Sequence, residues 1–165
     1  MRYFLNAFIV MGTCLFAYST KATTRPDEVL SSYVFMSRGD DFKERVLTVV
    51  KNPRMASIDF TNIKVEDDDL DIVFEGLVER QKTMDETGEK HKLHLLAFAG
   101  DITRIGFLMF LKNLQKGKEE GEKKIYPDVR EAVIKVSSLT LSEEFADQIS
   151  EVAPSVFAGR LRIVD

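Results

Sequence analysis

The densest group of acidic side chains lies in KVEDDDLDIVFEG, residues 64–76, where five carboxylates occupy six consecutive positions. Carboxylate oxygens are the ligands that Ca²⁺ accepts, so Asp67, Asp69 and Asp71 are the candidate metal ligands of the chain. An EF-hand loop counted from Asp67 needs glycine at its sixth position and glutamate at its twelfth, where this sequence has isoleucine and valine. We therefore expect the group to be a solvated connection between two strands, with no metal and no other cofactor.

The tripeptide Arg38-Gly39-Asp40 is a second candidate site, because integrin receptors recognise this sequence when a loop of an extracellular protein presents it. Its three residues are therefore a candidate partner-binding site for adhesion. The same residues also fit an ordinary junction between two helices, in which Gly39 ends one helix and Asp40 or Asp41 caps the next. The sequence leaves both interpretations open.

Side chains for nucleophilic or metal-assisted catalysis are scarce. No serine has a Gly-x-Ser-x-Gly context, and no glycine-rich phosphate loop occurs. His91 and His94 would face opposite sides of a strand, which is a poor arrangement for a shared metal. Two carboxylates can always be found among 27 acidic residues, so an acid/base enzyme remains an alternative with no residues assigned.

Residues 1–22 have the pattern of a signal peptide, with Arg2 before an apolar stretch and small residues near the expected cleavage site. The apolar stretch is shorter than the about 20 residues that a membrane-spanning helix needs. Cys14, the single cysteine, lies within this segment, so the mature chain would have none. We therefore expect a secreted or periplasmic protein. A retained signal anchor and a lipoprotein cleaved before Cys14 are the alternatives.

The charge balance excludes one class of partner. The formal net charge is −4, and removal of the signal peptide with Arg2 and Lys21 makes it −6. A protein that binds nucleic acid through its phosphates needs an excess of lysine and arginine, so we expect no nucleic-acid partner. We also expect no membrane span in the mature chain.

The periodicity of apolar residues predicts secondary structure within one domain, residues 24–165. Helices are expected over about 26–35, 41–51 and 141–152, the last with Phe145 and Ile149 on its buried face. Strands are expected over about 57–65, 70–79, 91–99 and 157–163. Residues 104–112 and 129–139 fit either a strand or a helix, and we favour a strand for the first.

These elements predict an α+β fold, a single domain in which an antiparallel β-meander packs with about three helices. Because no catalytic motif occurs, we favour a non-catalytic binding protein whose partner is a protein or another macromolecule. A curved meander under helices can also enclose an apolar cavity, so a carrier of a small apolar ligand is a further alternative.

Overall fold

The computed structural model describes residues 31–89, 91–137, 139–140, 142–153 and 161–163. The expected signal peptide, residues 1–22, lies outside the described residues. Within the described part, strands and helices alternate along the chain and form a single α/β domain.

The central sheet has five strands, and every neighbouring pair is parallel. The order across the sheet is the order along the chain: β1 (Ser31–Val34), β2 (Met55–Asp59), β3 (Leu95–Phe98), β6 (Val133–Val136) and β7 (Leu161–Ile163). The connections contain the four helices α1 (Phe42–Val50), α2 (Asp67–Thr87), α3 (Arg104–Lys116) and α4 (Glu143–Val152).

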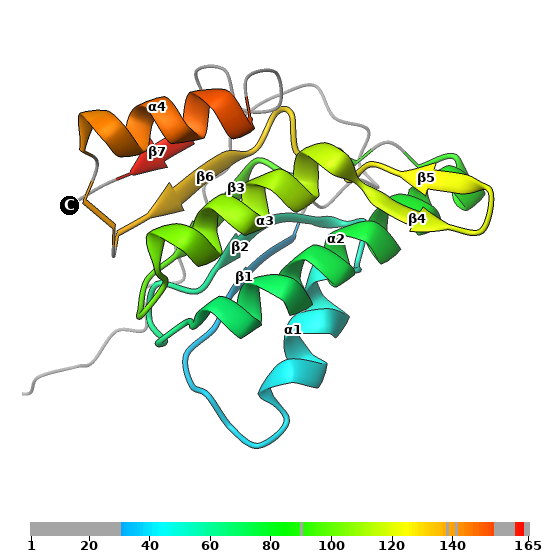
Figure 1. The fold of residues 1–165 in the computed structure, drawn as a ribbon. Helices are drawn as coiled ribbons and strands as arrows, with labels where there is room; N and C mark the ends of the chain where they lie inside the picture. The colour runs from blue at the N-terminus through cyan, green and yellow to red at the C-terminus, as the bar shows by residue number, and fades with distance from the viewer. Residues whose placement is uncertain (1–30, 90, 138, 141, 154–160, 164–165) are drawn as a thin grey trace, which may run out of the picture.

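All four helices lie in one layer on the same side of the sheet (Figure 1). Within this layer α1 packs on α2, α2 on α3, and α3 on α4. The cause is handedness, because connections between parallel strands are right-handed. A chain that always adds its next strand on the same side therefore places every helix on the same face. The other face of the sheet carries none of the helices that the structure describes.

The expected α+β fold with an antiparallel meander is wrong, and the errors lie in three segments. Residues 70–79, expected as a strand, belong to α2. Residues 104–112, for which we favoured a strand, belong to α3. Residues 31–34, expected in a helix, form β1. With these segments corrected, strands and helices alternate, as is typical of a parallel sheet.

Other predictions are confirmed. The helix expected over 41–51 is α1, and the helix expected over 141–152 is α4, in which Phe145 and Ile149 are 0% and 9% exposed. The segment 129–139, for which the sequence left strand and helix open, contains strand β6. Strands β2, β3 and β7 overlap predicted strands, although they pair in parallel.

A row of stacked phenylalanines joins the first three strands at their carboxyl ends. The rings of Phe35 and Phe60 are 4.6 Å apart at an angle of 9°, and those of Phe60 and Phe98 are 5.4 Å apart at 10°. On the next strand Val136 pairs with Phe98 and continues the row. All four side chains are buried between the sheet and the helices. Each strand–helix unit therefore contributes a large apolar residue at the same position.

Helix α2 is the longest helix of the described part, and its neighbours explain its bounds. Its buried residues recur at helical spacing: Leu70, Val73, Phe74, Leu77 and Val78. At Gly76 the helix passes so close to α1 that a Cβ would lie 2.7 Å from the Cβ of Val50. The helix ends at Gly88, whose φ of 72° is the left-handed conformation that glycine adopts most readily.

A short antiparallel hairpin, β4 (Lys118–Glu120) and β5 (Lys123–Ile125), extends from the end of α3 (Figure 1). Ion pairs hold the hairpin against α2: Lys118 pairs with Glu75, and Lys82 with Glu120 at 2.6 Å.

Candidate functional site

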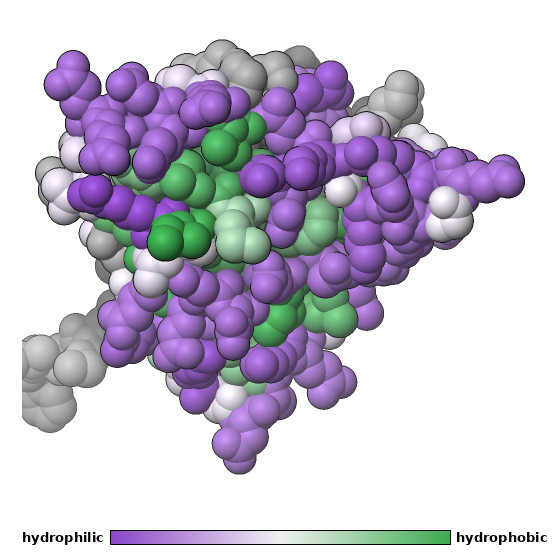
Figure 2. Space-filling view, viewed as in Figure 1, coloured by the Kyte–Doolittle hydropathy of each residue, from purple (hydrophilic) through white to green (hydrophobic). Residues whose placement is uncertain are grey.

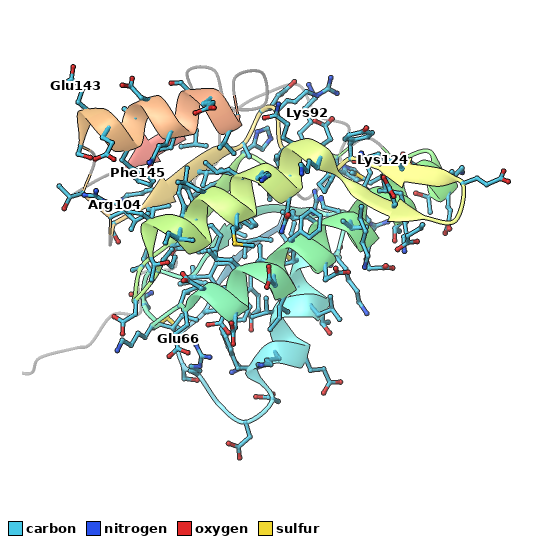
Figure 3. The ribbon with its side chains drawn as sticks, viewed as in Figure 1. Glu66, Lys92, Arg104, Lys124, Glu143 and Phe145 are labelled. Atoms are coloured by element: carbon cyan, nitrogen blue, oxygen red, sulfur yellow. The ribbon has the colours of Figure 1, made fainter. Side chains whose placement is uncertain are left out.

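The amino-terminal ends of the helices meet at one edge of the molecule, because each helix follows a parallel strand. Figure 3 shows Glu66, Arg104 and Glu143 toward this edge, and Lys92 and Lys124 on the opposite side. Helix amino termini carry partial positive charge and are common phosphate sites in α/β proteins. The side chains of this edge therefore decide whether it can bind an anion.

The start of α3 is occupied by Asp67 of α2. The Asp67 carboxylate accepts the Thr103 backbone N–H at 2.8 Å and the Thr103 hydroxyl at 2.6 Å. The Thr103 hydroxyl oxygen accepts the N–H of Gly106 at 3.0 Å. A Cβ on Gly106 would lie 2.2 Å from the Asp67 carboxylate, so glycine permits this approach. Asp67 thus supplies the negative charge that an external anion would otherwise bring.

Asp69 is the buried member of the acidic group, with 2% of its surface exposed. It accepts hydrogen bonds from Arg38 Nη1 at 2.6 Å and Nη2 at 3.1 Å, and from the Glu66 N–H at 2.9 Å. Arg38 also donates to the carbonyl of Lys64 at 2.8 Å, and its guanidinium lies over the Phe42 ring at 4.7 Å. The hydrogen bond to Asp69 raises the pKa of Arg38, so the guanidinium stays charged at neutral pH.

The expectation that residues 66–71 connect two strands is wrong, because these residues begin α2. Acidic side chains in the first turn stabilise a helix through its dipole. The candidate metal ligands Asp67, Asp69 and Asp71 do not converge: the first two carboxylates bind Thr103 and Arg38, and the third is exposed. Across the described ranges, no group of three or more His, Cys, Asp or Glu side chains could hold a metal ion.

Arg38, Gly39 and Asp40 lie in the loop between β1 and α1, not between two helices. Gly39 and Asp40 are exposed, whereas the Arg38 guanidinium is held by Asp69. A receptor that reads the Arg38 charge would therefore have to compete with Asp69. We therefore expect no adhesion through this tripeptide, which a cell-attachment assay can test.

The order of the strands bears on where a ligand would bind. In open α/β sheets, ligands occupy a crevice at the point where the strand order reverses and adjacent connections run to opposite faces. The order β1-β2-β3-β6-β7 contains no reversal. The described sheet therefore has no crevice of this kind.

At the opposite edge of the sheet, Arg80 of α2 is 2% exposed. It donates to the carbonyl oxygens of Asn52, Pro53 at 2.7 Å and His91 at 3.3 Å. Burial lowers the pKa of Arg80 to about 10, so the side chain remains charged at neutral pH. Arg80 ties the segments before β2 and β3 together, and this accounts for its burial without a ligand.

Two surface hollows lie on this half of the molecule. One, of about 500 Å³, is at the carboxyl end of α2, and the other, of about 550 Å³, is between α2, α3 and the hairpin. Charged and polar side chains line most of both: Gln81, Asp85, Glu89, His91, Lys92, Asp128 and Arg130 in the first, and Asp71, Glu75, Asn113, Lys116, Lys118, Glu119 and Lys124 in the second. Neither is the apolar pocket that a carrier of a small apolar ligand requires.

The helix side presents an exposed surface of mixed character. Figure 2 shows it mainly hydrophilic, with an apolar patch among the charged side chains. On α3, Ile105 and Met109 are 72% and 58% exposed. These two residues stand one helical turn apart and form a short apolar ridge.

The remaining surface is the open face, by which we mean the strand side chains that point away from the helices. Successive side chains of a strand alternate between faces, and the buried partners Ile58, Leu96 and Ile134 face the helices. The open face therefore consists of Ser32 and Val34 of β1, Ser57 and Asp59 of β2, Leu95 and Ala97 of β3, and Val133 and Lys135 of β6. The two residues of β1 are exposed, Ala97 is 2% exposed, and the other five are half-buried.

One row of the open face carries opposite charges on either side of the central strand. The strand register places Val34 beside Asp59, Asp59 beside Ala97, and Ala97 beside Lys135. Asp59 accepts the N–H of Thr61 at 2.7 Å and its hydroxyl at 2.6 Å, which fixes the carboxylate. The alternation of polar and apolar residues in β2 was visible in the sequence, but the row requires the parallel register.

Within the described residues, no helix combines the length and the apolar character needed to cross a membrane. No protein-family model, curated protein sequence or solved structure matches the chain.

Proposed function

We propose that the protein is a non-catalytic interaction protein that binds another protein through the open face of its sheet. The observation that supports this most directly is that, among the described residues, a wholly parallel sheet has helices on one face only. Parallel sheets in proteins are almost always covered on both faces, because their strands present apolar side chains on both. Leu95 and Val133 are such side chains on the open face and are half-buried, so a covering partner removes their remaining apolar surface from water.

Two further observations favour binding over catalysis. The strand order offers no crevice, and Asp67 and Asp69 already use their carboxylates within the protein. An acid/base enzyme would need carboxylates or histidines that converge on a free space. Export, which the pattern of residues 1–22 predicts, belongs to the same proposal and makes the partner an extracytoplasmic protein.

A photo-cross-linking amino acid tests the surface directly. It would replace Ser57 on the open face, Met109 on the apolar ridge of α3, or Asp147 on the exposed side of α4. We expect specific cross-linked partners from position 57 and none from position 147. The purified partner should then bind the wild-type protein and lose affinity for Ser57→Arg, which places a large charged side chain on the open face.

Cross-links from position 109 alone would overturn the choice of surface and favour the ridge of α3. Cross-links from none of the three positions, in cells that make the protein at its natural level, would overturn the proposal. Circular dichroism of each variant excludes misfolding as the cause.

A further inference from the structure

We propose that the partner on the open face is a second copy of this chain, in an isologous dimer whose two sheets pack face to face. This inference rests on the proposed function and names its partner. It rests on the charges around the central strand. Asp59 lies beside Ala97 on the neighbouring strand on one side, and Lys135 lies beside Ala97 on the neighbouring strand on the other side.

This arrangement is complementary to itself. Neighbouring strands are about 4.8 Å apart, so Asp59 and Lys135 lie at equal distances, about 4.8 Å, on either side of β3. A two-fold axis that runs along β3 between the two sheets exchanges the β2 side with the β6 side. Asp59 then faces Lys135 of the second copy, and Lys135 faces Asp59 of the second copy. Every dimer gains two opposite-charge pairs from one surface, as isologous interfaces require.

The side chains on the axis suit a close approach. Leu95 of β3 lies on it, is half-buried and faces its own counterpart, while Ser57 faces Val133. Ala97 also lies on the axis but is only 2% exposed, so it adds no bulk and little contact area. Packed sheets stand about 10 Å apart and cross at about 30°, and small or aliphatic side chains fill that distance. The interface therefore has an apolar centre flanked by charge pairs, which is the ordinary anatomy of a protein–protein interface.

Other occupants fit this row less well. A uniformly acidic surface or a nucleic acid would pair with Lys135 but meet Asp59, and the formal net charge of −4 adds to that repulsion. A uniformly basic surface would pair with Asp59 but be repelled by Lys135. A partner must present both charges in mirror order at the same spacing, and a second copy does so by symmetry.

The dimer is expected to be reversible. Five strands at about 4.8 Å spacing and about four residues at about 3.3 Å rise give a face of roughly 20 by 13 Å. This is smaller than the about 800 Å² per partner of a standard interface, and such contacts are weak or transient. We expect dissociation in the micromolar range or above, so association must be followed over a wide range of concentration.

Sedimentation equilibrium between about 1 µM and about 1 mM tests the inference. The wild-type chain should pass from monomer to dimer. Asp59→Lys and Lys135→Asp should each weaken self-association at least about tenfold, because like charges then face each other twice. An equimolar mixture of the two variants should dimerise again, because lysine pairs then meet aspartate pairs across the axis.

The mixture is the decisive experiment, because it restores the opposite-charge pairs across the interface while each chain still carries its substitution. It also guards against local damage from the loss of the Asp59–Thr61 hydrogen bonds, because a damaged chain would not be rescued by mixing. Lys112→Glu and Asp147→Lys are matched controls, as both residues are exposed on the helix side, and neither should change the association.

Each contrary outcome overturns a different claim. A wild-type chain that stays monomeric throughout, while probes at position 57 capture another protein, overturns the dimer and leaves the proposed function standing. A dimer that neither charge reversal weakens overturns the assigned face. Monomers without any cross-link from position 57 overturn both.

Discussion

The Arg38 guanidinium and the Asp69 carboxylate form a two-point ion pair, with Nη1···Oδ2 of 2.6 Å and Nη2···Oδ1 of 3.1 Å. The pair joins the loop after β1 to the first turn of α2. Asp69 is buried while the Arg38 side chain is 35% exposed, so the arginine brings the neutralising charge from the surface side. The same carboxylate accepts the Glu66 N–H and helps to start α2.

Replacement of Arg38 by glutamine should therefore destabilise the protein. The substitution leaves a buried carboxylate without its charged donors, and loss of hydrogen bonds to a charged group is worth about 1.5–3 kcal/mol. Urea unfolding measures the change in free energy. Arg54→Gln is the matched control, because the Arg54 side chain is 68% exposed and its ion pair with Glu89 is long, at 3.7 Å. Its loss should change stability by less than about 0.5 kcal/mol. Equal effects of the two variants would contradict the structural role of Arg38.

Cell adhesion through Arg38-Gly39-Asp40 is expected to be absent, because Arg38 is already bound to Asp69. Asp40→Glu should then leave attachment of integrin-bearing cells to a protein-coated surface unchanged. The variant keeps the charge and adds one methylene, so folding is unaffected. Attachment that disappears with this change would show that the tripeptide is read by a receptor.

Gly76→Ala tests the contact between α1 and α2. Alanine favours a helix over glycine by about 1 kcal/mol, yet the new Cβ would stand 2.7 Å from the Cβ of Val50, which the backbone of α1 fixes. Helix α1 must move, and overpacking of this kind costs about 1–3 kcal/mol. We expect a net loss of stability in chemical unfolding.

A helix position without that contact is the control for Gly76. Asp71→Ala lies on the exposed side of the same helix and should be close to neutral. A Gly76→Ala variant more stable than the wild type would mean that the two helices are farther apart than the structure has them.

Phe60→Ala should be among the most damaging single substitutions, because Phe60 is 1% exposed and stacks on both Phe35 and Phe98. Removal of a buried phenylalanine side chain costs about 3–5 kcal/mol. Tyr126→Ala, at a 53% exposed aromatic, should cost less than about 1 kcal/mol. Thermal and urea unfolding of both variants measure the two losses of stability. Similar losses would contradict the packing of the stacked phenylalanines.

The Asp128–Arg130 pair predicts a specific pH dependence. The hydrogen bond from Arg130 lowers the pKa of Asp128 below its ordinary value of 3.8. The folded state therefore favours the charged carboxylate, and this stabilisation is complete above the unfolded pKa and is lost as the pH falls through the lower folded pKa. Arg130→Gln should return the pKa of Asp128 toward its ordinary value, as followed by NMR titration of the carboxyl carbon. A titration curve of Asp128 that is unchanged by this substitution would contradict the pair.

The sequence predicted the elements whose patterns were unambiguous and failed where two patterns coincided. In α2, Leu70, Phe74 and Val78 fit both a period of two with Ile72 and a helical period with Val73, and the strand interpretation was wrong. Acidic residues at the start and a glycine at position 88 are helix-end signals that would have decided the case.

The candidate sites show the same division. That Asp67, Asp69 and Asp71 form one acidic group is plain from the sequence, but their partners Thr103 and Arg38 lie more than 30 residues away and depend on the order of the strands. The row that contains Asp59 and Lys135 depends on the register as well. Neighbours set by tertiary packing leave no local pattern in the sequence.

The chain-ordered sheet also determines how the protein should fold and come apart. Each described strand of the sheet pairs only with the sheet strands that precede and follow it along the chain, so the sheet can form by closing one connection after another. Among the described strands, β1 and β7 each have a partner on one side only, whereas β3 has two strands on either side. Opening is therefore expected to begin at an edge and advance inward, and backbone amides of β3 should be the last to exchange with solvent deuterium.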